Sequence, residues 1–226
     1  LLLLLALFLF HSCTGGGPGK SNVALLGTIT TASRGGQSVV ASLNDGEIPD
    51  SVPAAMRQRF NVPGRTGRPQ RPGVQRYECA WDNPVTIDES AVFWYNYDSL
   101  VSLPRAYRFK YWNGNEYVPV ENPSGLGLLN DKFNHTSFSE ITTSKLLIEI
   151  DSVQRFMPAI LEWRILKSKG SPAVAPVIRA GGDRDVITGG KTYLSALIKT
   201  VGPLKNTLWT ATGPGPVMFA DPANPV

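Results

Sequence analysis

Cysteine and histidine are scarce in this chain, which limits the chemistry that it can perform. Only 2 Cys and 2 His occur in 226 residues, and their spacing does not match a zinc site. His11 lies in an apolar leader, so His135 is the only histidine left for a catalytic triad, and we expect it at a surface or turn. Cys79 alternates with Tyr77 and Trp81, so we expect it to be a small core residue.

Motifs that mark several other classes of protein are also missing. The chain has no phosphate-binding glycine loop and no nucleic-acid-binding motif, and its formal net charge of +4 is mild. Its 18 acidic residues could include a pair of the glycosidase kind, but no spacing singles one out. We therefore expect a non-catalytic chain that does not bind nucleic acid.

The apolar run at the N-terminus is too short to cross a membrane. Residues 1–10 read LLLLLALFLF, whereas a spanning helix needs roughly 20 apolar residues. Such a run is typical of a secretory signal, and Phe10–Cys13 resembles a bacterial lipoprotein cleavage box in which Cys13 is lipidated. The alternative is an ordinary signal peptide with an incidental cysteine. We expect residues 1–19 to be a signal and a tether. The protein is then expected to be an extracellular or outer-membrane-anchored lipoprotein that contacts the membrane only through its lipid.

Long amphipathic helices are absent from the first three quarters of the sequence, where strand patterns are frequent. In 107–112 (YRFKYW) aromatic residues alternate with Arg108 and Lys110, which predicts a strand with one aromatic and one solvated face. Asn113-Gly114 predicts the turn of a hairpin, and 117–120 predicts its returning strand. This hairpin is expected to supply much of an aromatic core.

Other strands are expected where aromatic and β-branched residues cluster between turn residues. Val92–Tyr97 has such residues in both phases, so we expect it to be buried and central. The remaining strands are expected at 77–81, 85–87, 133–138, 145–150 and 160–166, the first two being separated by a turn at Asp82-Asn83-Pro84. Together they predict an all-β domain over residues 20–168, built as a sandwich of two antiparallel sheets.

Residues 51–77 differ in composition from the rest of that domain. They contain six arginines, four prolines and three glycines, and no Lys, Asp or Glu. Such a segment cannot pack a core of its own and predicts a long basic surface loop. The loop is either a solvated insertion or a cationic rim that attracts an anionic glycan.

The last fifty or so residues have the rhythm of an immunoglobulin-like sandwich. After a linker at 169–176, short strands are expected at 186–188, 193–197, 208–210 and 217–219. A complete sandwich of that kind uses about 100 residues. We therefore expect 177–226 to be a partial immunoglobulin-like domain whose closing strands are missing from the sequence.

Several short pieces occur in a recognisable order and spacing. They are Asn22-Val23-Ala24, 43–46 (LNDG), 92–95 (VFWY), Leu103-Pro104, 111–114 (YWNG), 118–120 (VPV), 131–134 (DKFN), Thr142-Thr143 and 160–164 (ILEWR). Through them, residues 21–167 resemble a discoidin-type, galactose-binding-like β-sandwich (jelly-roll) domain of the kind attached to secreted bacterial glycoside hydrolases. The chain departs from that pattern at 97–99 and in the enlarged loop at 51–77.

A second resemblance covers the C-terminal part of the chain. It rests on 180–183 (AGGD), 208–210 (LWT), 213–215 (GPG) and 217–222 (VMFADP). Through these pieces, residues 177–226 resemble the front half of a polycystic-kidney-disease-type (PKD-type) immunoglobulin-like repeat.

The discoidin-type resemblance implies a structural calcium ion. Its ligands would be oxygens of the Asp-Gly turn at Asp45 and the carboxylate of Glu162 near the final strand, and hard oxygen ligands suit calcium. The alternatives are an ordinary turn at Asp45 and a buried acid at Glu162 that accepts backbone amides.

Sugars bind proteins through aromatic rings and planar polar groups, often on the loops of a rigid scaffold. Tyr97, Asp98 and Arg105 flank one loop, and Trp112 falls on the polar phase of its strand, so these four are the candidate carbohydrate-binding residues. The alternative for Trp112 is that the basic loop at 51–77 covers it. Trp94 and Tyr95 are expected in the core instead.

These patterns together favour a non-catalytic carbohydrate-binding module. Its partners would be a polysaccharide or glycan and downstream domains of the same chain, against which it could position a glycoside hydrolase domain. The alternative is a structural or adhesive scaffold that binds no free sugar. A hydrolase whose active site lies further along the chain is compatible with either.

Overall fold

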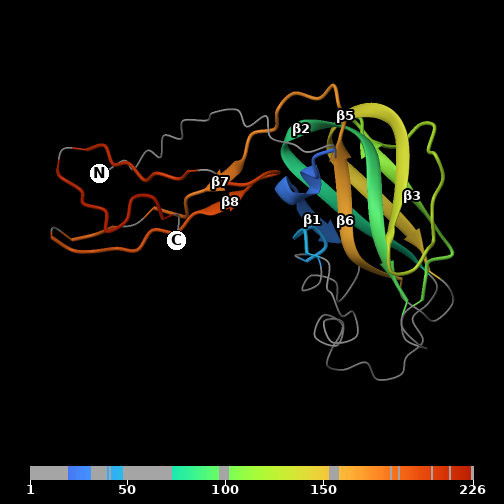
Figure 1. Ribbon diagram of the computed structural model, residues 1–226, viewed down its shortest axis with the longest axis horizontal. Coiled ribbons are helices and arrows are strands. Elements are labelled where there is room, and N and C mark those ends of the chain that lie inside the picture. The colour runs from blue at the N-terminus through green and yellow to red at the C-terminus, as the bar shows by residue number, and fades with distance from the viewer. Residues whose placement is uncertain are drawn as a thin grey trace, which may run out of the picture. The chain divides into compact units, whose positions relative to one another are not determined.

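The computed structural model describes residues 20–31, 40, 42–47, 73–96, 102–152, 158–183, 185–187, 189–204, 206–213 and 215–224. The expected signal and tether, including Cys13, and residues 51–72 of the basic segment lie outside these ranges. The chain divides into a larger compact unit, Lys20–Pro172, and a smaller one that contains Ala173–Val226 (Figure 1). Within the described ranges no helix is both long and apolar enough to span a bilayer.

Antiparallel strands make up most of the larger unit. Its elements are the 3-10 turn η1 (Val23–Leu26) and the strands β1 (Thr28–Thr31), β2 (Val74–Tyr95), β3 (Ala106–Trp112), β4 (Tyr117–Pro119), β5 (Phe133–Asp151) and β6 (Ala159–Lys167). The strands are hydrogen-bonded in the order β1-β2-β5-β3-β4, and β6 pairs with β2. The predicted all-β class is confirmed.

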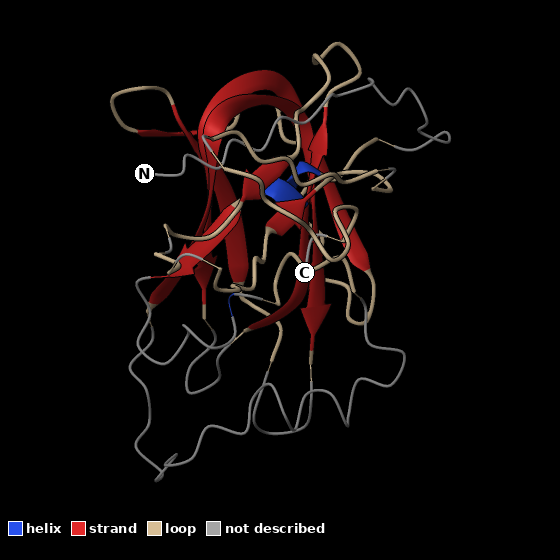
Figure 2. Cartoon of the chain, turned by 90° about the vertical axis from the view of Figure 1, so that its left-hand side faces the viewer, coloured by secondary structure: helices blue, strands red, loops and turns tan. Residues whose placement is uncertain are grey.

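Two long strands, β2 and β5, contribute to both layers of the sandwich. The first half of β2 pairs with β1 and with the second half of β5. The second half of β2 pairs with β6 and with the first half of β5. Figures 1 and 2 show both strands curving over at one end of the unit, so that one hydrogen-bonded sheet folds into two facing layers.

The bend in β2 corrects one local prediction. Asp82-Asn83-Pro84 was expected to be a turn between two strands, but β2 runs through it with a register shift between Ala80 and Val85. Pro84 has no N–H to donate to the ladder, and a bulge is a place where a strand can accept this loss and bend. Similarly, the strands expected at 133–138 and 145–150 are two halves of β5.

Aromatic side chains from both layers meet in the core. Trp94 of β2 lies 5.0 Å from Tyr107 of β3, and Phe109 of β3 stacks on Trp163 of β6 at 6.4 Å between ring centroids. All four are buried, as are Tyr95 and Cys79. The predicted aromatic face of 107–112, and the core positions of Trp94, Tyr95 and Cys79, are confirmed.

The predicted hairpin is also confirmed. Lys110, Tyr111 and Trp112 of β3 pair with β4, and the turn between the strands is closed by a 3.1 Å hydrogen bond from the Asn113 amide to the Glu116 carbonyl. Gly114 has a φ of 103°, which a residue with a Cβ rarely adopts. The Asn113 side-chain oxygen accepts the amides of residues 115 and 116 and holds this geometry.

The N-terminal segment begins with η1 before β1. The Asn22 side chain accounts for this start, because it accepts the Ala24 amide at 3.2 Å and so caps a turn. The same oxygen accepts the Ile165 amide of β6 at 3.1 Å. Asn22 thereby fastens the start of the unit to its last strand.

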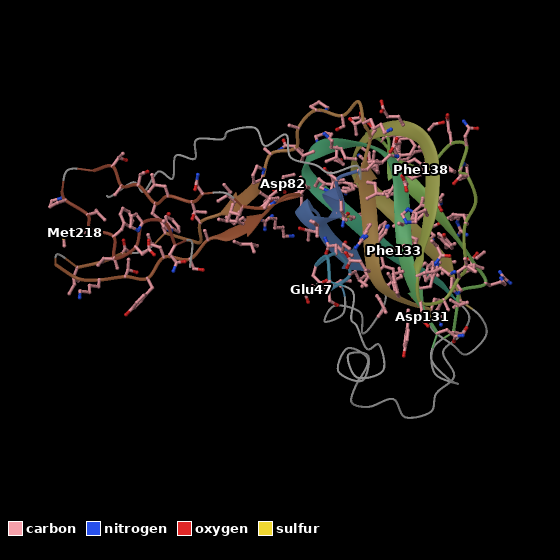
Figure 3. The ribbon with its side chains drawn as sticks, viewed as in Figure 1. Glu47, Asp82, Asp131, Phe133, Phe138 and Met218 are labelled. Carbon is pink, nitrogen blue, oxygen red and sulfur yellow. The ribbon has the colours of Figure 1, made fainter. Side chains whose placement is uncertain are left out.

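In the smaller unit, β7 (Val177–Arg179) and β8 (Leu197–Lys199) form a two-stranded antiparallel ribbon. The described residues of the four segments expected as strands are irregular, apart from Leu197, the first residue of β8. Ile187, Tyr193 and Met218 are between 85% and 93% exposed (Met218 is labelled in Figure 3). Among the residues of this unit that the structure describes, two strands of three residues give one narrow layer, and no second sheet covers these side chains, so their pattern alone does not produce strands.

Candidate functional site

The layer formed by β1, β3, β4 and the adjoining halves of β2 and β5 has one face turned away from the aromatic core. Residues that pair across strands point to the same side of a sheet. Arg76, Glu149 and Arg108 form one such row, and Trp112 pairs with Tyr117 in another. We call this surface the outer face; its charged and aromatic residues are Arg76, Glu78, Arg108, Lys110, Trp112, Tyr117, Lys145, Glu149 and Asp151.

Three cations surround one buried carboxylate on the outer face. The two oxygens of Glu149 accept hydrogen bonds from Nε of Arg76 and Nε of Arg108, each at 2.7 Å, and Lys110 Nζ lies 3.0 Å from Oε2. Burial favours the neutral acid, but the hydrogen bonds from the three cations outweigh it and lower the pKa of Glu149 to about 2. Glu149 is therefore ionised at any physiological pH.

Asp151 extends this network to a fifth side chain. Its Oδ2 lies 3.2 Å from Nη1 of Arg108. The hydrogen bond to Glu149, helped by the charge of Asp151, raises the pKa of the Arg108 guanidinium further above its usual value. Arg108 is therefore held by two carboxylates and has a fixed orientation on the sheet.

An aromatic pair lies further along the outer face. The rings of Trp112 and Tyr117 are 5.3 Å apart and inclined by 64°, and Lys145 Nζ is 5.5 Å from the Trp112 ring centroid. Tyr117 donates its hydroxyl hydrogen to Glu78, whose other oxygen lies 3.7 Å from Lys145 Nζ. Burial, together with Glu78, raises the pKa of Tyr117, so the phenol stays protonated. Both rings are half-buried, and their polar neighbours Glu78 and Lys145 pair with each other.

The four candidate sugar-binding residues do not form a single site among the residues that the structure describes. Tyr97 and Asp98 lie outside the described ranges. Arg105 is exposed just before β3, where its amide donates to the Asp151 carbonyl at 2.9 Å, and Trp112 ends the same strand. At about 3.3 Å per strand residue the two are roughly 23 Å apart. A monosaccharide could contact one of them but not both.

The two candidate metal ligands, in contrast, are brought together. Glu162 on β6 is fully buried, and its Oε1 accepts the Gly46 amide at 3.2 Å. The turn is fixed to β6 by the hydrogen bond from the Trp163 amide to the Leu43 carbonyl, and the exposed Asp45 accepts the Glu47 amide at 2.9 Å. Among the described residues there is no group of three or more His, Cys, Asp or Glu side chains that could hold a metal. Any ion here would need turn carbonyls or water to complete its ligands.

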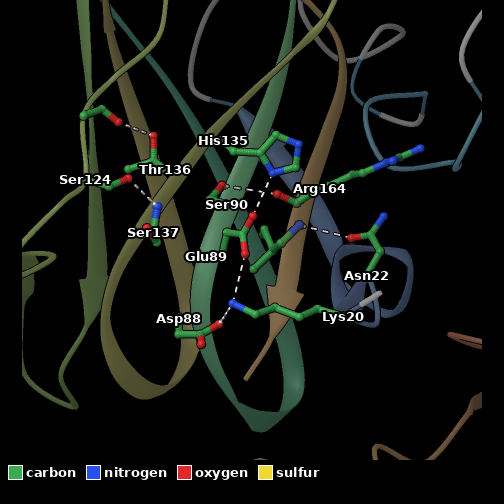
Figure 4. Close-up of polar contacts among 12 residues, drawn as sticks. Lys20, Asn22, Asp88, Glu89, Ser90, Ser124, His135, Thr136, Ser137 and Arg164 are labelled. Carbon is green, nitrogen blue, oxygen red and sulfur yellow. Dashed lines mark hydrogen bonds and ion pairs between the residues drawn. The ribbon is translucent and has the colours of Figure 1, made fainter. Parts of the chain in front are cut away.

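His135 lies on the outside of the other layer, at the surface as predicted. Its Nδ1 is 2.7 Å from Glu89, and Lys20 pairs with Glu89 at 2.9 Å and with Asp88 at 2.8 Å (Figure 4). Burial opposes ionisation of Glu89, but hydrogen bonds from Lys20 and His135 prevail and lower its pKa. Every carboxylate of this cluster has a cationic or imidazole partner, which is typical of a solvated ion-pair network.

The most important residues that sequence reasoning missed are Glu78, Tyr117, Lys145 and Glu149. Alternation along 145–150 could have placed Lys145 and Glu149 on one face, and Trp112 was correctly assigned to the polar phase of its strand. The partners of Glu149, however, are 73 and 41 positions away in the chain. Only the strand register brings them together.

Comparison with known proteins supports the fold. The sequence matches no protein-family model and no curated protein. A structure from the Streptococcus pneumoniae β-galactosidase BgaA has a TM-score of 0.50 and 16% identity, covering 68% of this chain and all of its own. The family 32 carbohydrate-binding module of C. perfringens NanJ, solved with galactose, has a TM-score of 0.44 and 13% identity over 65% of this chain and 97% of its own.

A third structure is chitosan-binding module 1 of a chitosanase/glucanase from Paenibacillus sp. IK-5. Its TM-score is 0.40 and its identity 12%, over 64% of this chain and 97% of that one. At such identities a likeness concerns the fold and not the ligand. The larger unit of this chain has the discoidin-like antiparallel β-sandwich fold, as predicted.

Proposed function

We propose that this chain is a non-catalytic carbohydrate-binding module that holds a glycan on the outer face of its sandwich. The observation that carries the proposal is the half-buried pair of Trp112 and Tyr117, fixed beside the ammonium of Lys145 and the carboxylate of Glu78. A sugar ring has apolar C–H faces and a rim of hydroxyl groups. Aromatic rings contact the former, and charged oxygen and nitrogen atoms bond the latter.

The rigidity of this arrangement also supports binding. Both rings stand on paired strands, and the Trp112 carbonyl accepts a 2.8 Å hydrogen bond from the Thr143 hydroxyl. The inclination of the rings is maintained by the bond between Tyr117 and Glu78. Side chains that are already ordered lose little entropy when a ligand binds.

The fold provides a further, weaker argument. The module of similar fold in BgaA belongs to a β-galactosidase, an enzyme that by its name acts on a glycan. We propose by analogy that this chain positions a glycoside hydrolase domain against its polysaccharide. Residues 177–226 would then be a PKD-type spacer, and Cys13 a lipid anchor outside the cell or at the outer membrane.

A structural calcium ion is part of the proposal. The donor chemistry fits, because a buried carboxylate of β6 reaches under a turn whose carbonyl groups and Asp45 supply hard oxygens. Glu162 and Asp45 would hold the ion, which when bound would supply positive charge that keeps the turn on the sheet. The loop residues Tyr97, Asp98 and Arg105 remain a second predicted contact surface for sugar.

The proposal is tested by screening residues 20–226 on a glycan array and measuring the affinity of each hit by titration calorimetry. We expect Trp112→Ala to weaken binding at least tenfold, because the ring is the main contact for the sugar face. Tyr193→Ala removes a 90% exposed ring of the smaller unit and should leave binding unchanged. Failure of the wild-type chain to bind any glycan would support the scaffold alternative instead, and full binding by Trp112→Ala would place the sugar elsewhere.

A further inference from the structure

The outer face carries, besides its aromatic pair, a fixed group of cations that a neutral sugar would not use. We propose that the glycan bound there is anionic, a polysaccharide bearing carboxylate or sulfate groups, and that Arg76 and Arg108 bind these groups. This inference rests on the proposed function and names its ligand class.

The arrangement of the Glu149 network places positive charge toward solvent. The Glu149 side chain is only 4% exposed, whereas those of Arg76 and Arg108 are 54% and 43% exposed. Each guanidinium uses Nε for the buried carboxylate. The carboxylate therefore lies beneath, and the cationic groups lie above it on the surface of the sheet.

The donors of these arginines are not exhausted by their contacts within the protein. A guanidinium has five N–H donors. Arg76 uses Nε for Glu149, and Arg108 uses Nε for Glu149 and Nη1 for Asp151. The remaining N–H groups suit a carboxylate or sulfate oxygen, which arginine binds in a planar, bidentate manner.

The balance of charge points to the same class of ligand. Arg76, Arg108 and Lys110 face two carboxylates, those of Glu149 and Asp151, so this cluster keeps one net positive charge. The hydrogen bonds from these cations keep Glu149 ionised and the arginines fixed in place. An incoming anion would meet cations that need no reorganisation, which favours its binding.

The aromatic pair and the cationic cluster are spaced for one extended ligand. Glu149 and Lys145 are four positions apart on β5, which corresponds to roughly 13 Å along a strand. A chain of a few sugar rings spans this distance. One ring would contact Trp112 and Tyr117, while an acidic group further along would reach Arg76 and Arg108.

The test compares anionic and neutral glycans on residues 20–226 by titration calorimetry. The probes are oligogalacturonate for carboxylates, chondroitin sulfate for sulfates, and galacto-oligosaccharide as the neutral partner. We expect at least one anionic probe to bind tenfold or more tightly than the neutral one. Its affinity should fall as NaCl is raised, because salt screens exposed charges.

Variants locate the contact. Arg76→Gln should weaken the anionic probe about tenfold and leave any neutral binding unchanged, and Trp112→Ala should weaken both. Lys169→Gln removes an exposed positive charge outside the outer face and should change affinity less than twofold. A thermal melt of each variant shows whether it is folded. The conservative Arg76→Lys keeps a cationic partner for Glu149 but loses the planar guanidinium group.

The outcomes separate this inference from the proposed function. If neutral glycans bind as well as anionic ones and Arg76→Gln has no effect, the inference is overturned and the proposed function remains. If no glycan binds, both are overturned. Equal weakening by Arg76→Gln and Lys169→Gln, or equal binding of poly-glutamate, would show nonspecific attraction of anions and would overturn the inference.

Discussion

Glu149 is a buried acid on the outer face, beneath two half-exposed arginines, and the reason for its burial lies in its neighbours. A carboxylate removed from water is costly unless charges and hydrogen bonds replace the water. Arg76, Arg108 and Lys110 provide both, at 2.7–3.0 Å. Removing the negative charge would leave three cations facing one another around a neutral group.

We expect Glu149→Gln to destabilise the larger unit by roughly 2 kcal/mol at pH 7, since a hydrogen bond to a charged group contributes about that much. The pKa of Glu149 is lowered from its ordinary value to about 2, so its contribution is complete above pH 4.5 and is lost as the pH falls from 4.5 to 2. Urea unfolding between pH 2 and 7 measures both effects.

The matched control is Glu140→Gln, which neutralises an exposed glutamate of the same strand. It should change stability by less than 0.5 kcal/mol, as is usual for exposed sites away from special contacts. If wild type and Glu149→Gln lost stability in parallel from pH 4.5 to 2, the acid transition would not come from Glu149.

At the scale of single residues, the sequence predicted correctly which side of a strand a side chain faces. It did not predict which other side chains that residue contacts. The alternation in 107–112 correctly placed Tyr107 and Phe109 inside and Trp112 on the polar side. It could not show that Glu149 would meet Arg76, because that contact depends on which strands are neighbours and in what register.

Among the elements, the segment 127–132 before β5 has no regular structure, and several of its hydrogen bonds go to the side chain of Asn134. Asn134, buried at the start of β5, accepts the Leu129 amide at 2.8 Å and donates to the carbonyls of Leu129, Lys132 and Val92. A loop without strand partners needs such bonds for its buried polar groups. Asn134 therefore fixes much of the path of 127–132, together with Trp94, whose indole donates to the Gly127 carbonyl and whose own carbonyl accepts the Asp131 amide.

We expect Asn134→Ala to cost roughly 2–3 kcal/mol, because it removes one buried hydrogen bond, to the Val92 carbonyl, and three part-buried ones to the loop. Urea unfolding gives the magnitude, and amide hydrogen exchange should increase at Leu129. Asn115→Ala, in the exposed hairpin turn, is the control and should be within 0.5 kcal/mol of wild type. An unchanged exchange rate at Leu129 would show that the loop does not depend on Asn134.

The turn at 43–47 is the element that a bound calcium ion would stabilise. We expect millimolar CaCl2 to raise the melting temperature of the wild-type chain and a chelator to reverse the rise. At 100 times the dissociation constant the gain is about 2.7 kcal/mol. Glu162→Gln should abolish the shift, while Glu121→Gln, an exposed control, should keep it. If calcium did not change the melting temperature of the wild-type chain, this element would be an ordinary turn over a buried acid and not a calcium site.

At the scale of the whole molecule, the two units differ in the core that they contain. The larger unit has two layers with aromatic residues between them, whereas the smaller has one ribbon and a buried Trp209 held by hydrogen bonds to the carbonyls of Pro222 and Asn224. Burial of apolar surface is the main source of stability. The larger unit should therefore fold without the smaller.

We expect a fragment of residues 20–172 to unfold in one cooperative transition with the midpoint that this unit has in the longer chain. Differential scanning calorimetry of the fragment and of residues 20–226 tests this. The reverse fragment, 173–226, should show little cooperative unfolding, since an isolated two-stranded ribbon is marginal in water. A fragment 20–172 that does not fold would contradict the division into units.

The sequence by itself determined the class of structure, the hairpin and which face of it is aromatic. These features depend on local alternation and turn chemistry, which are readable from neighbouring residues. It also brought Asp45 and Glu162 to attention through resemblance, and the structure places that turn over that acid.

Only the tertiary structure decided that β2 and β5 are single strands shared by two layers, and that Glu149 is surrounded by cations. Each of these depends on pairing between segments far apart in the chain. A strand pattern says which way a side chain points but not which strand lies beside it, because neighbours are selected by the packing of the whole sheet.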